Sequence, residues 1–102
     1  MQVKVTTKPN RIDEELRAAF EQLGKVGEAE AKMLAPVDTG ELRDSINHSV
    51  TTSSNKLVIH LKADADHAAY VEPKQPFMSP AAELMEAQLV EIIEAAVKRG
   101  VR

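Results

Sequence analysis

The stretch that decides how this chain folds reads Ala35-Pro36-Val37-Asp38-Thr39-Gly40-Glu41-Leu42-Arg43-Asp44-Ser45-Ile46. A helical pattern of apolar residues leads up to it, and an alternating, strand-like pattern follows it. Because a proline disfavours the helical conformation of the residue before it, we expect a helix to end at Ala35. Asp38 is placed to cap a short helical turn that follows Gly40. The stretch therefore predicts a joint between a helical part and a β part.

The residues before this joint predict a short strand and a long helix. Val3 and Val5 alternate with polar residues over 2–6, which is typical of a terminal edge strand. Asn10 is a good candidate for the helix N-cap. The apolar residues that follow share one helical face and are Ile12, Leu16, Phe20, Leu23 and Val26.

Two glycines, Gly24 and Gly27, interrupt this helical pattern. Each lowers the helical propensity by about 1 kcal/mol relative to alanine. They predict either a kink or a close approach by another backbone.

The residues after the joint predict a β-hairpin. Alternating apolar residues over 46–50 and again over 57–62 indicate two strands, and 52–55 has the composition of a turn. The Leu57, Ile59 and Leu61 face of the second strand should lie on the helices. The result is an antiparallel hairpin to which the strand at 2–6 can add.

The C-terminal part predicts an irregular segment and a second long helix. Residues 63–67 should leave the sheet, 68–72 fits either a helical turn or a short strand, and 73–76 reads as a loop. Ser79 as N-cap with Pro80 at the first helical position is a strong helix start. An apolar stripe follows in this helix, formed by Met85, Leu89, Ile92, Ile93 and Ala96. Gly100, after the basic residues at 98–99, is a plausible stop.

Together these elements predict the α+β class within a single domain of residues 1–102. A small antiparallel sheet, made of the hairpin and the N-terminal edge strand, packs against a long N-terminal helix and a C-terminal helix. The chain has no cysteine and a formal net charge of −3 with both signs interspersed. We therefore expect no disulfide, no membrane segment and no sequence-specific binding of nucleic acid.

Two patterns could carry chemistry, and each has a simpler interpretation. Asp38-Thr39-Gly40 is the triplet of retroviral-type aspartic proteases, in which two carboxylates share a proton. Those proteases are nearly all-β, whereas a helix precedes the triplet here. His48, His60 and His67 could bind a metal only if several of them converged, and the alternation places His48 and His60 on opposite faces. We predict no catalytic, cofactor-binding or metal-binding residues.

The stretch at 35–46 closely resembles the most recognisable motif of the tail-component proteins of tailed bacteriophages, the family named after the gene-ten product of a lambdoid phage. The family motif reads approximately Ala-Pro-x-Asp-Thr-Gly-x-Leu-Arg-x-Ser-Ile at the end of a long helix. A second segment, Tyr70-Val71-Glu72 followed by Gln75-Pro76-Phe77-Met78-Ser79-Pro80-Ala81, looks like the family's entry to its final helix. The resemblance covers residues 10–98, although the loop after Glu72 is shorter than in the family.

The motif residues have structural roles in this interpretation. Pro36 ends the helix, Gly40 relaxes the backbone, and Leu42 and Ile46 return to the core. Arg43 is available for a carboxylate, for which Glu72 is the candidate. The full set of structural motif residues is Pro36, Asp38, Thr39, Gly40, Leu42, Arg43, Ser45, Ile46, Glu72, Pro76, Phe77 and Pro80.

The resemblance implies a non-enzymatic protein of phage or prophage morphogenesis. It would act in head–tail joining or tail completion as a ring-forming subunit at the neck, beside other head–tail connector or tail proteins. It would be located in the virion and, during assembly, in the host cytoplasm. The alternative is a small cytosolic bacterial binding module with an unrelated partner. The expected interface lies in the loop 73–76, the hairpin tip 52–55 and the outer side of the last helix, at Lys74, Gln75, Ser53, Ser54, Val90 and Val97.

Overall fold

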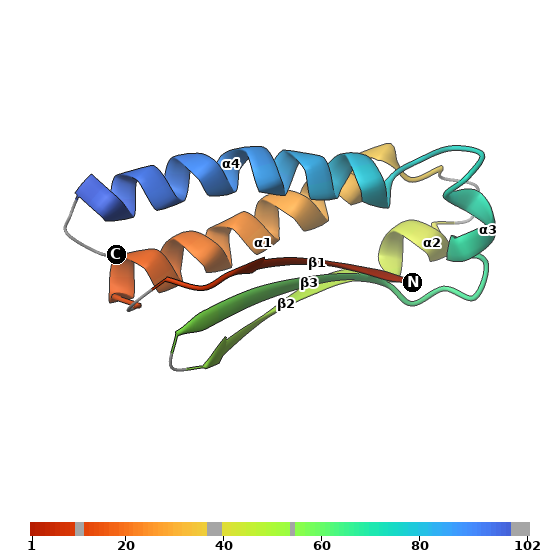
Figure 1. The fold of residues 1–102 in the computed structure, drawn as a ribbon. Helices are drawn as coiled ribbons and strands as arrows, with labels where there is room; N and C mark the ends of the chain where they lie inside the picture. Colours follow the sequence, from red (N-terminus) through yellow and green to blue (C-terminus); the bar gives the residue numbers. More distant parts are fainter. Residues whose placement is uncertain (10–11, 37–39, 54, 99–102) are drawn as a thin grey trace.

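The computed structural model describes residues 1–9, 12–36, 40–53 and 55–98. Two long helices run side by side above a small sheet, and two short helices lie at one end of the molecule (Figure 1). In chain order the elements are β1 (Gln2–Thr7), α1 (Glu14–Leu34), α2 (Glu41–Asp44), β2 (Ile46–Ser53), β3 (Lys56–Ala63), α3 (Ala68–Val71) and α4 (Met78–Lys98). The predicted α+β class is confirmed.

The sheet has the strand order β1-β3-β2, and both pairings are antiparallel. Ile59 in the central strand lies opposite Val5 on one side and Val50 on the other. The predicted hairpin and the predicted edge strand are therefore both present. The hairpin turn is shorter than the expected 52–55, because Thr52 and Ser53 still pair with Leu57 and Lys56; Ser54 lies outside the described residues.

Helix α1 begins later than the sequence predicted. The N-cap is Asp13, whose Oδ1 accepts a hydrogen bond from the Leu16 amide at 2.7 Å. Two glutamates occupy the first turn, where negative charge favours the helix dipole. The prediction of Asn10 as N-cap was wrong, since the helix starts at Glu14; Asn10 itself lies outside the described residues. At the other end Ala35 is the C-cap in an extended conformation, as Pro36 requires.

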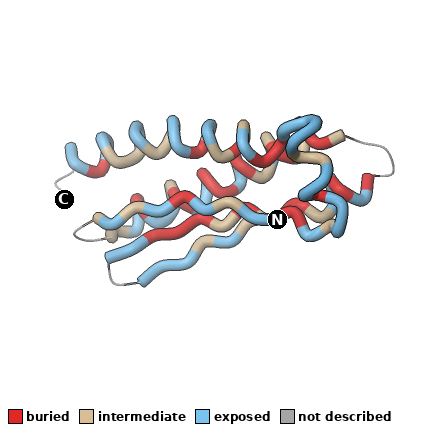
Figure 2. The backbone as a smooth tube through the Cα atoms, turned by 45° about the vertical axis from the view of Figure 1, so that its right-hand side comes forward, coloured by how far each residue is buried: buried red, intermediate tan, exposed pale blue. Residues whose placement is uncertain are grey.

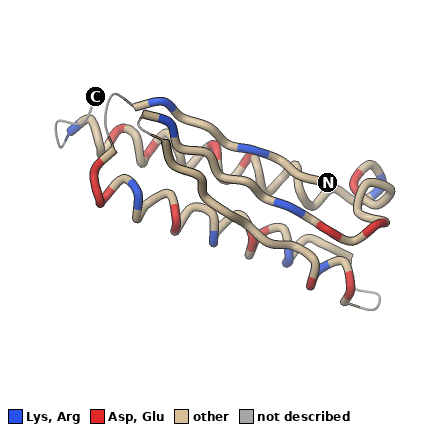
Figure 3. Tube along the Cα trace, turned by 90° about the horizontal axis from the view of Figure 1, so that it is seen from below, with Lys and Arg blue, Asp and Glu red and all other residues tan. Residues whose placement is uncertain are grey.

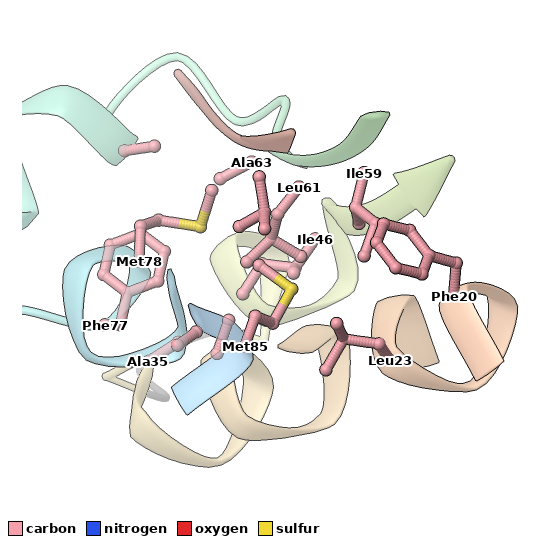
Figure 4. Packing of buried hydrophobic residues seen from close by; sticks show 14 of the residues in the cluster. Phe20, Leu23, Ala35, Ile46, Ile59, Leu61, Ala63, Phe77, Met78 and Met85 are labelled. Carbon is pink, nitrogen blue, oxygen red and sulfur yellow. The ribbon is translucent and has the colours of Figure 1, made fainter. Parts of the chain in front are cut away.

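Both long helices cover the same face of the sheet. Helix α1 packs on β2 and β3, α4 packs on β1, and the two helices pack on each other. The buried positions lie between these layers (Figure 2). The largest fully buried side chains are Phe20, Phe77, Leu16, Leu23, Ile46, Leu57, Ile59, Leu61, Met78 and Met85, and several of them meet around Met85 in Figure 4.

Each of the two glycines of α1 lies against a side chain from a neighbouring element, the sheet for Gly24 and α4 for Gly27. A Cβ at Gly24 would lie 2.6 Å from Cδ2 of His48, which comes from the sheet. A Cβ at Gly27 would lie 2.8 Å from Cγ of Met85, which comes from α4. The close approach predicted at these glycines is therefore made by side chains and not by another backbone.

Candidate functional site

The described residues offer no enclosed site. They line no pocket, and they contain no group of three or more histidine or acidic side chains that could hold a metal ion. Within the same ranges, no helix is both long enough and apolar enough to cross a membrane. The candidate functional regions of this chain are therefore its joints and its exposed faces.

The first joint connects α1 to β2 through α2. Gly40 is the N-cap of α2 and has a φ of +84°, in the left-handed region that favours glycine. Leu42 and Ile46 are buried, as expected. The Ser45 hydroxyl donates to the Leu42 carbonyl at 2.7 Å. Residues 37–39 lie outside the described ranges, so the predicted cap by Asp38 stays a prediction.

This joint is also tied to the far end of the hairpin. The carbonyl of Ser45 accepts from the Asp64 amide at 3.3 Å and from the Asn47 side chain at 3.1 Å. The Asn47 amide also donates to the Asp64 carboxylate at 2.9 Å. These hydrogen bonds join the start of β2 to the end of β3 beside Ser45, which belongs to the motif at 35–46.

The second joint, between α3 and α4, is held by one carboxylate. Glu72 accepts hydrogen bonds from the backbone amides of Phe77 at 3.1 Å, Met78 at 2.8 Å and Ser79 at 3.1 Å. It also accepts from the Ser79 hydroxyl at 2.8 Å. A helix leaves its first four amides without partners inside the helix. Glu72 takes three of them, and Pro80 at the fourth position has no N–H to satisfy.

Two predictions about this joint were wrong. Helix α4 begins at Met78, so Ser79 lies in its first turn and is not the N-cap. Arg43 does not pair with Glu72; its Nε lies 3.7 Å from Oδ1 of the neighbouring Asp44. The reason is the same for both: the Glu72 carboxylate already faces the amides at the start of α4, where the positive end of the helix dipole attracts it.

These contacts change the acidity of Glu72. Partial burial raises its pKa, but the hydrogen bonds from Met78, Phe77 and Ser79 together outweigh burial and hold the pKa of Glu72 below its usual range. The carboxylate is therefore ionised wherever the joint is formed at neutral pH. Glu72 belonged to the predicted motif, but its capping role was missed, because a cap five to seven residues before the amides it binds has no short sequence signature.

The histidines of the hairpin are separated, as the alternation predicted. His48 is paired with Leu61 and His60 with Ser49, so they occupy opposite faces of the sheet. Nδ1 of His48 lies 2.9 Å from Oε1 of Glu28 on α1. Burial raises the pKa of Glu28, but contacts with His48 and Lys32 outweigh it and lower the pKa below its usual range. His48 therefore has a structural partner between the sheet and α1.

The residues predicted to form an interface are on the surface. Lys74, Gln75 and Ser53 are exposed, and Ser54 lies outside the described residues. Val90 and Val97 on α4 are 57% and 53% exposed. These residues do not form one patch: they are distributed over the α3–α4 loop, the hairpin tip and α4. Their role in an interface stays a prediction.

The sequence model of one protein family, described as "Bacteriophage HK97-gp10, putative tail-component", matches residues 2–73. The match contains the motif at 35–46 and Glu72, and it ends before α4, so the resemblance noted at Gln75–Ala81 lies beyond it. No curated protein and no solved structure matched the chain. Since the matched segment is well over half of the 102 residues, the chain belongs to the HK97-gp10-like family of bacteriophage tail components.

Proposed function

We propose that this protein completes the phage tail or joins it to the head, as one subunit of a ring at the neck. Its membership of a phage tail-component family is the observation that carries the proposal. In this role the chain is a structural protein without catalytic activity. It is made in the host cytoplasm and is retained in the virion beside other connector and tail proteins.

The fold supports a subunit that keeps its shape during assembly. Hydrogen bonds of Asp64 with Ser45 and Asn47 join the end of β3 to the start of β2, and Glu72 fixes the start of α4. The two-layer arrangement leaves the outer side of α4 and one face of the sheet uncovered (Figure 1). A rigid subunit with two free faces can contact a neighbour on each side, which is the requirement for a ring.

The alternative interpretations have less support. The retroviral-type aspartic protease would require a nearly all-β fold, whereas two helices of 21 residues dominate this chain. Asp38 and Thr39 of the triplet lie outside the described ranges, and its Gly40 is the N-cap of α2. A bacterial binding module of unrelated function shares the fold, but no observation on this chain favours it over the phage role.

The test is deletion of the gene from the phage or prophage that encodes it, followed by electron microscopy of the lysate. We expect DNA-filled heads and separate tails to accumulate, and infectious particles to return when the purified protein is added. Adding the protein first to isolated heads or first to isolated tails identifies which side retains it. Intact infectious particles from the deletion strain would contradict the proposal.

The predicted loop contact can be tested in the same complementation assay. Lys74→Glu reverses the charge at the exposed α3–α4 loop, and Lys25→Glu on the exposed side of α1 is the matched control. If the loop meets a partner, Lys74→Glu reduces the yield of particles and Lys25→Glu does not. Equal yields from both variants would remove the loop from the interface.

A further inference from the structure

The uncovered faces of the molecule carry opposite charges. The three strands contain Lys4, Lys56 and Lys62 and no aspartate or glutamate. Helix α4 (Met78–Lys98) contains four glutamates and one basic residue, Lys98 in its last turn. Figure 3, seen from the sheet side, shows blue positions and no red ones along the strands. A chain whose net charge is only −3 has therefore separated its charges between two of its sides.

The lysines lie on the open face of the sheet. Lys62 alternates with the buried Leu61 and Ala63, and Lys4 alternates with the buried Val5, so both point away from the helices. Lys4 is opposite His60, and Lys62 is opposite Gln2 and Asn47. Two residues after Lys62, the Asp64 carboxylate accepts a hydrogen bond from Asn47, so one negative charge lies at the end of this face. The open face, which we call the basic sheet face, consists of Gln2, Lys4, Thr6, Asn47, Ser49, Thr51, Ser53, Lys56, Val58, His60 and Lys62.

The glutamates surround an exposed apolar strip on α4. Val90 and Val97 are one heptad apart and are more than half exposed, which is unusual for valines that serve only the core. Glu86 and Glu94 lie one turn before and after Val90, and all of them are exposed. We call this surface the acidic helix face; its residues are Glu83, Glu86, Ala87, Val90, Glu91, Glu94 and Val97.

Within the part of the chain that the structure describes, these charges form no ion pair with one another. Ion pairs join Glu28 to Lys32 and His48, and Arg43 to Asp44. Neither the three strand lysines nor the four α4 glutamates takes part in them. By contrast, the exposed side of α1 mixes both signs, with Arg17 and Lys25 beside Glu14 and Glu21. The separation of charge is therefore specific to the sheet and α4.

We propose that the basic sheet face of one copy of this chain binds the acidic helix face of the next copy. This inference rests on the proposed ring and names the surfaces that would form it. The dimensions agree: Lys56 to Lys62 spans about 20 Å along a strand, and Glu83 to Glu94 spans about 17 Å along a helix. Val90 and Val97 would pack on the exposed Thr6 and Thr51, which lie on either side of the buried Val58, while glutamates on either side reach the lysines.

Charge also determines the symmetry of this contact. Sheet against sheet would place lysine beside lysine, and α4 against α4 would place glutamate beside glutamate, and like charges oppose binding by several kcal/mol. Only the sheet-to-helix pairing satisfies both faces. Since the two faces lie on opposite sides of the molecule (Figure 1), each copy binds one neighbour on each side. Such a head-to-tail contact closes into a ring when its rotation allows.

A second copy fits the basic sheet face better than a nucleic acid does. The strands contain no phenylalanine, tyrosine or tryptophan on which a base could stack. The acidic helix face would repel a phosphate backbone that tried to contact both sides of the molecule. Binding of DNA is therefore an outcome against the proposal, and sedimentation of the chain with an added random-sequence DNA duplex measures it.

The test uses the full chain in sedimentation velocity and native mass spectrometry. One variant, Lys4→Glu with Lys62→Glu, makes the sheet face acidic; a second, Glu86→Lys with Glu94→Lys, cancels the negative charge of the helix face. Each should weaken self-association by about tenfold or more. The matched controls make the same charge changes on α1: Arg17→Glu with Lys25→Glu, and Glu14→Lys with Glu21→Lys. Circular dichroism confirms that each variant is folded, and Lys4→Gln with Lys62→Gln replaces the first variant if it is not.

The decisive arm mixes these two variants. The first variant has an acidic sheet face and an acidic helix face, whereas the second has a basic sheet face and a helix face whose four charges cancel. The new carboxylates on the sheet of the first variant can pair with the new ammonium groups on α4 of the second. We expect oligomers that contain both variants in alternation, although neither variant assembles alone. Salt should dissociate the wild-type oligomer as the Debye length falls from about 30 Å to about 3 Å.

Several outcomes would overturn the proposal. The first is a wild-type chain that stays monomeric at low salt and high micromolar concentration. The second is an α1 control that weakens self-association as much as the variant it matches. The others are a mixture of the two variants that does not associate, and a sheet variant whose only effect is loss of DNA binding. The proposed neck function is judged separately by incorporation into particles. If the charge variants enter virions normally, the proposed interface is refuted and the proposed neck function is not. If the protein forms charge-dependent oligomers but is absent from virions, the neck function is refuted and the interface is not.

Discussion

The two joints of this molecule, at 35–46 and at 68–79, are built in different ways. At the first, the chain turns because of backbone geometry: Ala35 is extended, Gly40 has a positive φ, and Ser45 bonds a carbonyl three residues before it. At the second, the start of α4 depends on one side chain, since Glu72 binds three consecutive amides and a hydroxyl there.

The difference shows two ways of ordering a helix boundary. The first joint spreads its stabilisation over several residues that are close in sequence, so removal of any one contact leaves the others. The second relies on a single carboxylate at the start of α4, so one substitution removes all four of its hydrogen bonds and leaves only backbone bonds such as those of Lys74 and Gln75 to Val71. The first joint should therefore tolerate single substitutions better than the second. Gly40 is the exception, because its positive φ strains any residue with a side chain.

The largest effect should come from removing the cap of α4. Glu72→Ala leaves the amides of Phe77 and Met78 without a partner where they are partly buried. We expect the free energy of unfolding to fall by about 2–3 kcal/mol, measured by urea denaturation. Glu83→Ala, on the exposed side of the same helix, is the control and should change little. If both variants were equally stable, the carboxylate would not hold the second joint.

The next largest effect should come from the backbone of the first joint. Gly40→Ala should cost about 1–2 kcal/mol, because an L-residue is strained in the left-handed conformation. The nearest atoms to a new Cβ would be 3.6 Å away or more, so no clash adds to this cost. Gly40→Asn should recover part of the loss, because asparagine tolerates this conformation. An alanine variant as stable as the wild type would show that the joint adapts its backbone.

The charge of Glu72 can be isolated by acid. Because folding lowers the pKa of Glu72, its contribution to stability is fully present above the pKa of the unfolded chain. It is lost as the pH falls through the folded pKa, when the carboxylate is protonated in the folded state too. Glu28 has a lowered pKa as well and adds to the decline in the same acidic range.

Urea titrations of the wild type and Glu72→Gln across this range separate the two carboxylates. We expect the stability difference between the two proteins to shrink as the solution becomes more acidic. It should be smaller at every pH than the neutral-pH loss in Glu72→Ala, because glutamine keeps one acceptor oxygen. A difference that grows on acidification would contradict the sign of the pKa change.

A smaller effect is expected at Ser45. Ser45→Ala removes the hydroxyl that donates to the Leu42 carbonyl and should cost about 1 kcal/mol or less. Ser49→Ala, at an exposed position of the following strand β2, is the control. A loss as large as that of Glu72→Ala would mean that the first joint also depends on one side chain.

The smallest effect on stability is expected at Arg43. Its side chain is 45% exposed and its partner Asp44 is 76% exposed, so Arg43→Ala should change stability by less than about 0.5 kcal/mol. If Arg43 contacts another protein of the particle, the same variant should reduce phage yield while the thermal melt stays unchanged. A clear loss of stability would instead indicate a structural role for this arginine.

Most of the fold could be predicted because its signals are local. The periodicity in α1 and α4, the alternation in β1, β2 and β3, and the proline after Ala35 each act within a few residues. The errors also have local reasons. Asp13 competes with Asn10 as a cap, and a strong Ser-Pro start signal at 79–80 concealed the capping of Met78 by Glu72. The prediction that Arg43 pairs with Glu72 was wrong, because the sequence does not show that the Glu72 carboxylate points to the amides of α4.

The sequence by itself determined the α+β class, the order of the elements, the joint after Ala35 and the motif that indicates the family, because each depends on residues near one another in the chain. Only the tertiary structure decided the rest. It placed His48 against Gly24 and Met85 against Gly27, turned Glu72 toward the amides of α4, and put the strand lysines and the α4 glutamates on opposite sides. These contacts join residues that are distant in the chain, and they form only when both long helices pack on the same face of the sheet.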